Sequence, residues 1–231
     1  MCSAKKIAIL GAGGKTTALT ALAQQHRAAR VLLTTTTHIL PVHPPVCDRL
    51  CIDPDAQTLL EALSQPGITC AGMTAQAGKL SALPPDLLAQ ACTCCDWLFY
   101  EADGAKRLPL KLHAPHEPVI LPDTTHGIIV AGLSALGKPL AQAVHRYTLR
   151  PDWAQTPMRL VDSDIVLNCV LDAVQCSGLP TTQLTVLLNQ ADTPAQVQAA
   201  QPILAALHAQ GIAAYPAQLA KNCDVLTAIC P

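Results

Sequence analysis

Short apolar runs alternate along the chain with longer segments in which apolar residues recur every three or four positions. The runs predict buried strands, and the longer segments predict helices. The predicted strands are 7–10, 31–34, 97–100, 118–121, 127–132, 185–188 and 212–215, and the predicted helices are 16–26, 56–63, 140–145, 163–176 and 194–208. Such alternation is typical of a mainly parallel sheet with helices on both faces, so we expect an α/β fold.

No internal repeat, low-complexity tract or long linker divides the sequence. We therefore expect one domain over residues 1–231. The segment from about 135 to 180 is mostly helical, and insertions are well tolerated at loop tips. It could form a small helical insertion in that domain.

Composition narrows the class of protein. Only 13% of residues are charged and the formal net charge is −1, so the chain offers no basic surface typical of nucleic-acid binding. No apolar run reaches the roughly 18 residues of a membrane span, and no signal peptide is evident, so we expect a cytoplasmic protein with no membrane partner. The cysteine-rich segment 92–95 lacks a second ligand pair, which favours structural thiols over a metal centre.

The first predicted strand runs into a glycine-rich turn and then a helix. Glycines there let backbone N–H groups converge on an anion, to which a lysine adds its charge. Only two residues separate Gly11 from Gly14, whereas four separate the first glycine from Gly-Lys-Thr in the usual phosphate loop. We interpret the turn as a short phosphate loop that binds a nucleoside triphosphate through Gly11, Ala12, Gly13, Gly14, Lys15, Thr16 and Thr17.

Two alternatives to this phosphate loop stay open. The turn could be purely structural, or it could be the Gly-x-Gly-x-x-Gly fingerprint of a dinucleotide site. The third glycine of that fingerprint is Thr16 here, and the second predicted strand ends in threonines with no acidic residue for a ribose.

Acidic residues follow the predicted strand 97–100. Ligands bind at the carboxyl ends of strands in open α/β sheets, so Glu101 and Asp103 are predicted to hold Mg²⁺ together with Thr16. Lys15, Glu101 and Asp103 are the predicted catalytic residues, and the N–H of Gly104 could meet the terminal phosphate. The alternative is a solvated turn.

Threonines 34–37 end the second predicted strand. Thr36 is a candidate to bind Mg²⁺ or the terminal phosphate, as switch threonines do, although threonines also simply favour strands.

The sequence Asn189-Gln190-Ala191-Asp192 follows a late predicted strand. It resembles the Asn-Lys-x-Asp loop of guanine-nucleotide-binding proteins, with Gln190 in place of the lysine. Asp192 could accept both donors of a guanine edge, and Asn189 could brace neighbouring loops. These two residues favour GTP slightly over ATP.

Dispersed polar residues carry weaker signals. His38, His43, His113 and His116 are predicted to be surface or hydrogen-bonded histidines rather than ligands. The basic residues after the acidic turn, Lys106, Arg107 and Lys111, could meet phosphate or a partner, but solvated charges are the commoner arrangement.

Several segments together resemble the YqeC family, accessory proteins of selenium-dependent molybdenum hydroxylases. They are GAGGKTT, TTTTHI, EADGAKRLPLKLHAPHEPVI, GLSALGKPLAQAVHR and LLNQAD. The resemblance implies a P-loop NTPase-like nucleotide-binding protein whose partner is a molybdenum hydroxylase or a cofactor-maturation protein. It makes Arg146 a candidate phosphate or partner contact, while Gln190 departs from the family's Asn-Lys-x-Asp loop and leaves the choice of nucleotide open.

These observations favour a Mg²⁺-dependent nucleoside triphosphatase that acts as a maturation factor. A small-molecule kinase or ATP-dependent ligase could use the same loop, with Asp103, Lys106 and Arg107 at an acceptor pocket. A nucleotide-binding module or cofactor chaperone without turnover is the third alternative.

Overall fold

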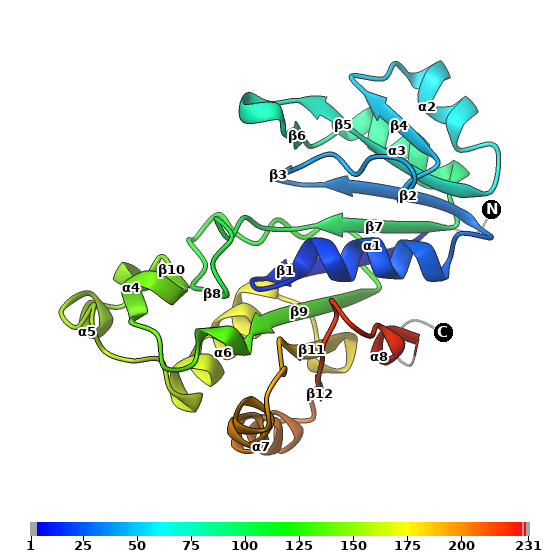
Figure 1. Ribbon diagram of the computed structural model, residues 1–231. Coiled ribbons are helices and arrows are strands. Elements are labelled where there is room, and N and C mark those ends of the chain that lie inside the picture. Colours follow the sequence, from blue (N-terminus) through cyan, green and yellow to red (C-terminus); the bar gives the residue numbers. More distant parts are fainter. Residues whose placement is uncertain (1–3, 228, 230–231) are drawn as a thin grey trace.

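A ten-stranded sheet forms the centre of the computed structural model, which describes residues 4–227 and 229 (Figure 1). The strand order is β12-β11-β9-β1-β7-β2-β5-β6-β3, and β4 pairs with the outer side of β5. Its strands are β1 (Lys5–Gly11), β2 (Arg30–Thr35), β3 (His38–Ile39), β4 (Arg49–Ile52), β5 (Gly67–Thr74), β6 (Leu80–Ser81), β7 (Trp97–Glu101), β9 (His126–Gly132), β11 (Leu184–Asn189) and β12 (Ala213–Pro216). Only the pairs that involve β6 are antiparallel, so the predicted mainly parallel sheet is confirmed.

Helices cover both faces of the sheet. The helices are α1 (Lys15–Gln25), α2 (Ala56–Ala62), α3 (Pro85–Cys94), α4 (Leu140–Ala143), α5 (Pro151–Ala154), α6 (Ser163–Ser177), α7 (Pro194–His208) and α8 (Asp224–Thr227). Alternate residues of β1 point to opposite faces: Ile7 and Ile9 pack with α1 and α8, whereas Ala8 and Leu10 pack with the cluster that contains α2, α3, α6 and α7. The predicted α/β fold is therefore confirmed.

Helix ends follow ordinary capping chemistry with one exception. Asp55, Asp162 and Thr193 cap α2, α6 and α7 through side-chain acceptors, and α7 has a full capping box. The cap of α1 is Gly14, which offers no side chain. The first turn of α1 is thus left open at the carboxyl edge of the sheet.

Several segments differ from the sequence predictions. No elements were predicted between residues 64 and 96, where β5 and α3 lie; Gly67 and Gly72 interrupt the apolar pattern of β5. Residues 118–121 are not a strand: Pro118 follows a cis peptide bond, and the segment lies across the end of β7, with Val119 N donating to Ala102 O at 2.9 Å. Such flanking prolines remove the donors that a ladder needs.

The predicted helix 140–145 ends early, at Ala143. Val144 and His145 form β10 (Val144–His145), which pairs in parallel with β8 (Leu110–Lys111) in a separate two-stranded sheet. Tertiary pairing with β8 overrides local helix propensity here. Figure 1 shows β8, β10, α4 and α5 beyond the carboxyl edge of the main sheet.

Later in the segment near 135–180, α6 packs against β9 and β1 and shares their hydrophobic cluster. Across residues 4–227 and 229, no helix combines the length and the hydropathy that a membrane crossing requires.

Candidate functional site

The turn between β1 and α1 is shaped by two glycines. Gly13 and Gly14 have φ of 79° and 136°, a region that L side chains rarely adopt. A Cβ on Gly13 would lie 2.6 Å from Gly132 Cα, and one on Gly14 would collide with the amide of Asn189. The chain therefore turns tightly here only because both residues are glycine.

The first turn of α1 presents open backbone amides. It has neither a side-chain cap nor an acidic residue, and the first bond into the helix runs from Ala18 N to Gly14 O at 3.0 Å. By contrast, Gly11 N donates to Asp103 Oδ2 at 2.9 Å and Ala12 N to Val130 O at 2.7 Å. An anion would thus meet the amides from Gly14 to Thr17, rather than every amide of the predicted loop.

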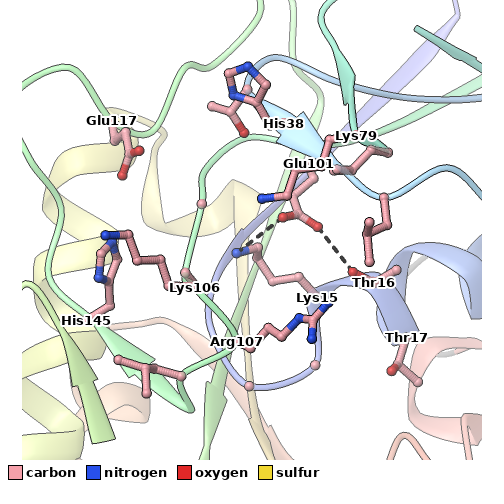
Figure 2. Close-up of a pocket in the computed structure, with 18 of the residues that line it drawn as sticks. Lys15, Thr16, Thr17, His38, Lys79, Glu101, Lys106, Arg107, Glu117 and His145 are labelled. Atoms are coloured by element: carbon pink, nitrogen blue, oxygen red, sulfur yellow. Dashed lines mark hydrogen bonds and ion pairs between the residues drawn. The ribbon is translucent and has the colours of Figure 1, made fainter. Parts of the chain in front are cut away.

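A cavity of about 570 Å³ lies in front of this turn (Figure 2). This volume is in the usual range for a small-molecule site. Its walls are Gly13, Gly14, Lys15, Thr16, Thr17, Thr37, His38, Ile39, Leu40, Lys79, Glu101, Gly104, Ala105, Lys106, Arg107, Leu108, Glu117, His145, Arg146 and Gln190. Several of the predicted site residues therefore share one cavity.

Lys15 lies between two carboxylates. Its Nζ is 2.9 Å from Asp103 Oδ1 and 3.5 Å from Glu101 Oε1, and it donates to Gly11 O at 2.8 Å. Burial alone would lower the pKa of Lys15, but the charges of Asp103 and Glu101 outweigh it and raise that pKa. Lys15 therefore stays a cation although it is only 5% exposed.

Thr16 and Glu101 fit a magnesium site. The Thr16 hydroxyl lies 3.4 Å from Glu101 Oε2, as the dashed line in Figure 2 marks. Adjacent oxygen ligands of an octahedral Mg²⁺, each about 2.1 Å from the ion, lie about 3 Å apart. Burial raises the pKa of Glu101 while Lys15 opposes that rise, so a bound cation would stabilise the carboxylate further.

Asp103 does not fit the predicted role of a magnesium ligand. It is fully buried beneath the loop, and Gly11 N, Lys111 Nζ at 3.2 Å and His113 Nε2 at 2.7 Å all meet its Oδ2, while Lys15 meets its Oδ1. Burial would raise the pKa of Asp103, but Lys15, His113 and Lys111 outweigh it and hold the pKa well below its usual range. Asp103 instead anchors Lys15 as a fixed buried anion.

Sequence reasoning missed a buried polar network beside the loop. Lys111 is 2% exposed and bridges Asp103 and Glu117, with 2.8 Å to Glu117 Oε2, so the expectation of a solvated charge is wrong. Glu117 also pairs with Arg146 Nη1 at 2.5 Å. The alternating Leu110-Lys111-Leu112-His113 is a strand-like signal, but such alternation favours polar residues on a solvent face, so it does not indicate that Lys111 and His113 are buried.

His113 joins this network to α6. Its Nδ1 lies 2.7 Å from Asp172 Oδ2, opposite the contact of its Nε2 with Asp103. The histidine is hydrogen-bonded, as expected, but it is buried and not at the surface. Two carboxylates on one imidazole favour its protonated form.

This geometry predicts that stability falls above neutral pH. Burial would lower the pKa of His113, but its bonds to Asp103 and Asp172 outweigh burial and raise the pKa above its ordinary 6.5. The resulting stabilisation is full below pH 6.5 and is lost as pH rises through the folded-state pKa. Urea unfolding between about pH 6 and 9 should show this fall, and Asp172→Asn should reduce it. Asp123→Asn, at a site 88% exposed, should leave the fall unchanged; an identical profile for Asp172→Asn would contradict the assignment.

The loop at residues 189–192 supports the glycine turn, but only part of this loop lines the cavity. Asn189 Nδ2 donates to Gly13 O at 2.8 Å, and its Oδ1 accepts from Leu219 N at 2.9 Å. Gln190 lines the cavity, whereas Asp192 is exposed, lies outside the cavity lining and pairs with Lys221 at 3.0 Å.

Thr36 and Gly104 are placed differently from each other. Gly104 lines the cavity. The Thr36 hydroxyl donates to Val119 O at 2.9 Å and lies instead at a second, mainly apolar cavity of about 630 Å³ beside α3. Thr37 is the residue of the threonine run that lines the cavity at the glycine turn.

Comparison with known proteins adds a family relationship. The family model described as YqeC protein matches residues 7–148. A relative in Escherichia coli (strain K12), "Uncharacterized protein YqeC", is 39% identical over 151 residues, which are 62% of this chain and 57% of the relative. The chain thus spans little more than half the length of that relative. The matched family segment holds the glycine turn, Glu101, Asp103 and the Lys111–Glu117–Arg146 network, but not the loop at 189–192.

Proposed function

The chain belongs to the YqeC family, and from this premise we propose that it binds and hydrolyses a nucleoside triphosphate with Mg²⁺. The observation that carries the proposal is the open first turn of α1, which faces a cavity shared with Lys15, Thr16 and Glu101. Amides, a helix N-terminus and a buried cation at one place are suited to phosphate groups.

Each residue of the turn has a role in this proposal. The amides from Gly14 to Thr17 hold the phosphate oxygens, and Lys15 neutralises their charge. Asp103 is a positioning residue, because it touches Lys15 and not the cavity. Catalysis would rest on positioning the reacting groups and on stabilising the charge of the transition state, since phosphoryl transfer requires little covalent chemistry from the protein.

Thr16 and Glu101 would hold the metal ion. When bound, Mg²⁺ neutralises charge that develops on the phosphate oxygens. The 3.4 Å separation of the two side-chain oxygens supports this assignment. Gly104 lines the same cavity and would contact the terminal phosphate through its backbone.

Mg²⁺ dependence is the test of this site. Fluorescent analogues of GTP and ATP, titrated with and without Mg²⁺, should bind more tightly with the ion. Thr16→Ala should weaken binding with Mg²⁺ about tenfold and leave binding without Mg²⁺ nearly unchanged. The matched control is Thr17→Ala, which removes a hydroxyl from the same turn but keeps its amide. Failure of the wild-type chain to bind either analogue would overturn the proposal.

We further propose a slight preference for GTP and a role in maturing selenium-dependent molybdenum hydroxylases in the cytoplasm. The first rests on the Asn-x-x-Asp sequence after β11, although Asp192 lies outside the cavity lining and pairs with Lys221, and the second rests on the family resemblance. The ratio of GTP to ATP affinities in the titration above tests the base preference. Co-purification of a molybdenum hydroxylase or cofactor-maturation protein tests the partner.

A further inference from the structure

The cavity has a second wall that the nucleotide site described above does not use. Glu117, His145 and Arg146 form it, and Lys106 extends towards His145 (Figure 2). In the same view, Glu117 and His145 lie across the cavity from Lys15 and Thr16. A group bound there would face the end of a triphosphate that is seated on the turn.

The fold builds this wall from a dedicated element. The pair β8 and β10 stands apart from the main sheet, with Lys111 opposite His145 in register. Leu112 N donates to His145 O at 2.9 Å. In the β8–β10 sheet, Lys111 thus belongs to the buried network, whereas His145 lines the cavity.

The wall is also held firmly. Glu117 is fixed between Lys111 at 2.8 Å and Arg146 at 2.5 Å. Lys106, Arg107 and Arg146 adopt positive φ of 47°, 62° and 62°. Non-glycine residues adopt this region at an energetic cost, and such residues concentrate at functional sites. Three basic residues of this kind on one cavity indicate a site shaped for an anion.

Two cationic side chains of this region are unpaired. In the described residues, neither Lys106 nor Arg107 makes a side-chain hydrogen bond or ion pair, unlike Lys15, Lys111 and Arg146. Lys106 points towards His145, and Arg107 towards the start of α1 (Figure 2). Lys106 is therefore available to an anion beside His145.

His145 is a neutral base at this wall. Burial, followed by the charges of Arg146, Lys111 and Lys106, lowers the pKa of His145 to about 4, against a smaller opposing effect of Glu117. Its ring makes no hydrogen bond to any residue of 4–227 or 229. An imidazole with a free lone pair at a cavity can accept a proton from a bound hydroxyl.

We propose that this wall binds a second substrate, a small molecule with an anionic group and a hydroxyl group, and that the γ-phosphoryl group is transferred to that hydroxyl. This inference rests on the nucleotide site proposed above. Lys106 holds the anionic group, and His145 accepts the hydroxyl proton.

The transfer step balances without any further reactant. The acceptor oxygen forms a bond to the γ-phosphorus, and the bond from that phosphorus to the β,γ-bridging oxygen breaks. Its electron pair leaves with the nucleoside diphosphate, and the proton passes to His145. The hydrolysis proposed above is then the slow reaction in which water occupies the place of the acceptor.

Anion binding at this wall can be tested with inorganic phosphate. The full chain is first saturated with Mg²⁺ and a non-hydrolysable triphosphate analogue, so that the phosphate loop is filled, and phosphate is then titrated by calorimetry. One phosphate should bind, and Lys106→Ala should weaken it about tenfold or more. Lys138→Ala, which removes an exposed cation outside the cavity, should have little effect.

The proton-accepting role is tested on hydrolysis itself. His145→Ala and His145→Gln should slow phosphate release about 100-fold, while the affinity for the fluorescent triphosphate analogue stays within about twofold. His43→Ala, at an exposed histidine outside the cavity lining, should release phosphate at the wild-type rate.

The outcomes separate the two proposals. No phosphate binding beside a bound analogue, equal binding by Lys106→Ala, or wild-type hydrolysis by His145→Ala would each overturn the second-substrate site alone. Failure of the wild-type chain to bind the analogue would overturn the nucleotide site, and the second-substrate site with it.

Discussion

Replacing Asp103 with alanine is expected to lower the free energy of unfolding by about 3–5 kcal/mol. Asp103 is fully buried, and Lys15, Lys111 and His113 all meet its carboxylate. Its removal leaves buried cations facing each other without a counter-charge, which costs far more than the loss of an exposed ion pair. Urea unfolding at neutral pH measures the change.

Asp192→Ala is the matched control for this experiment. It also breaks a lysine–aspartate pair, with Lys221, but both side chains are largely exposed. Its effect should stay within about 0.5 kcal/mol. A comparably small loss for Asp103→Ala would show that Asp103 does not hold the buried network together.

Lys15→Met is expected to weaken binding of a Mg²⁺–triphosphate about 100-fold. Methionine keeps much of the lysine volume but removes the one cation that lies in the glycine turn itself. The same fluorescent titration measures the loss, and unfolding of the variant is followed in parallel because Glu101 loses its nearest cation.

The control for Lys15 is an exposed lysine outside this cavity, Lys138→Ala, for which wild-type affinity is expected. Unchanged affinity of a folded Lys15→Met would place the triphosphate elsewhere. A loss of affinity that merely follows a loss of folding would be recognised by the unfolding curve.

The strands that carry the site were readable from sequence. Buried parallel strands are short continuous apolar runs, and β1, β7 and β11 each end in the polar residues that the pattern singled out: the glycine turn, Glu101 and Asn189. A polar residue that directly follows such a run lies at the carboxyl edge of the sheet. This position does not fix whether the side chain faces the cavity, as Asp103 and Asp192 show.

The buried network was not readable in the same way. Its members come from separate elements: Lys111 from β8, Asp172 from α6, and Glu117 and Arg146 from connecting segments. The spacing of these residues in the sequence does not predict their contacts, because those contacts form only when separate elements pack together. The β8–β10 sheet was likewise hidden, since two-residue strands carry almost no periodicity.

The brace at Asn189 also bears on how the protein is made. Residues 11–17 leave the ribosome before residues 189 and 219, yet Gly13 is held by Asn189, and Asn189 in turn by Leu219. A nascent chain can form β1 early but cannot complete this brace until residue 219 has been synthesised. A ligand that needs the braced turn is therefore expected to bind only after residue 219 has been synthesised.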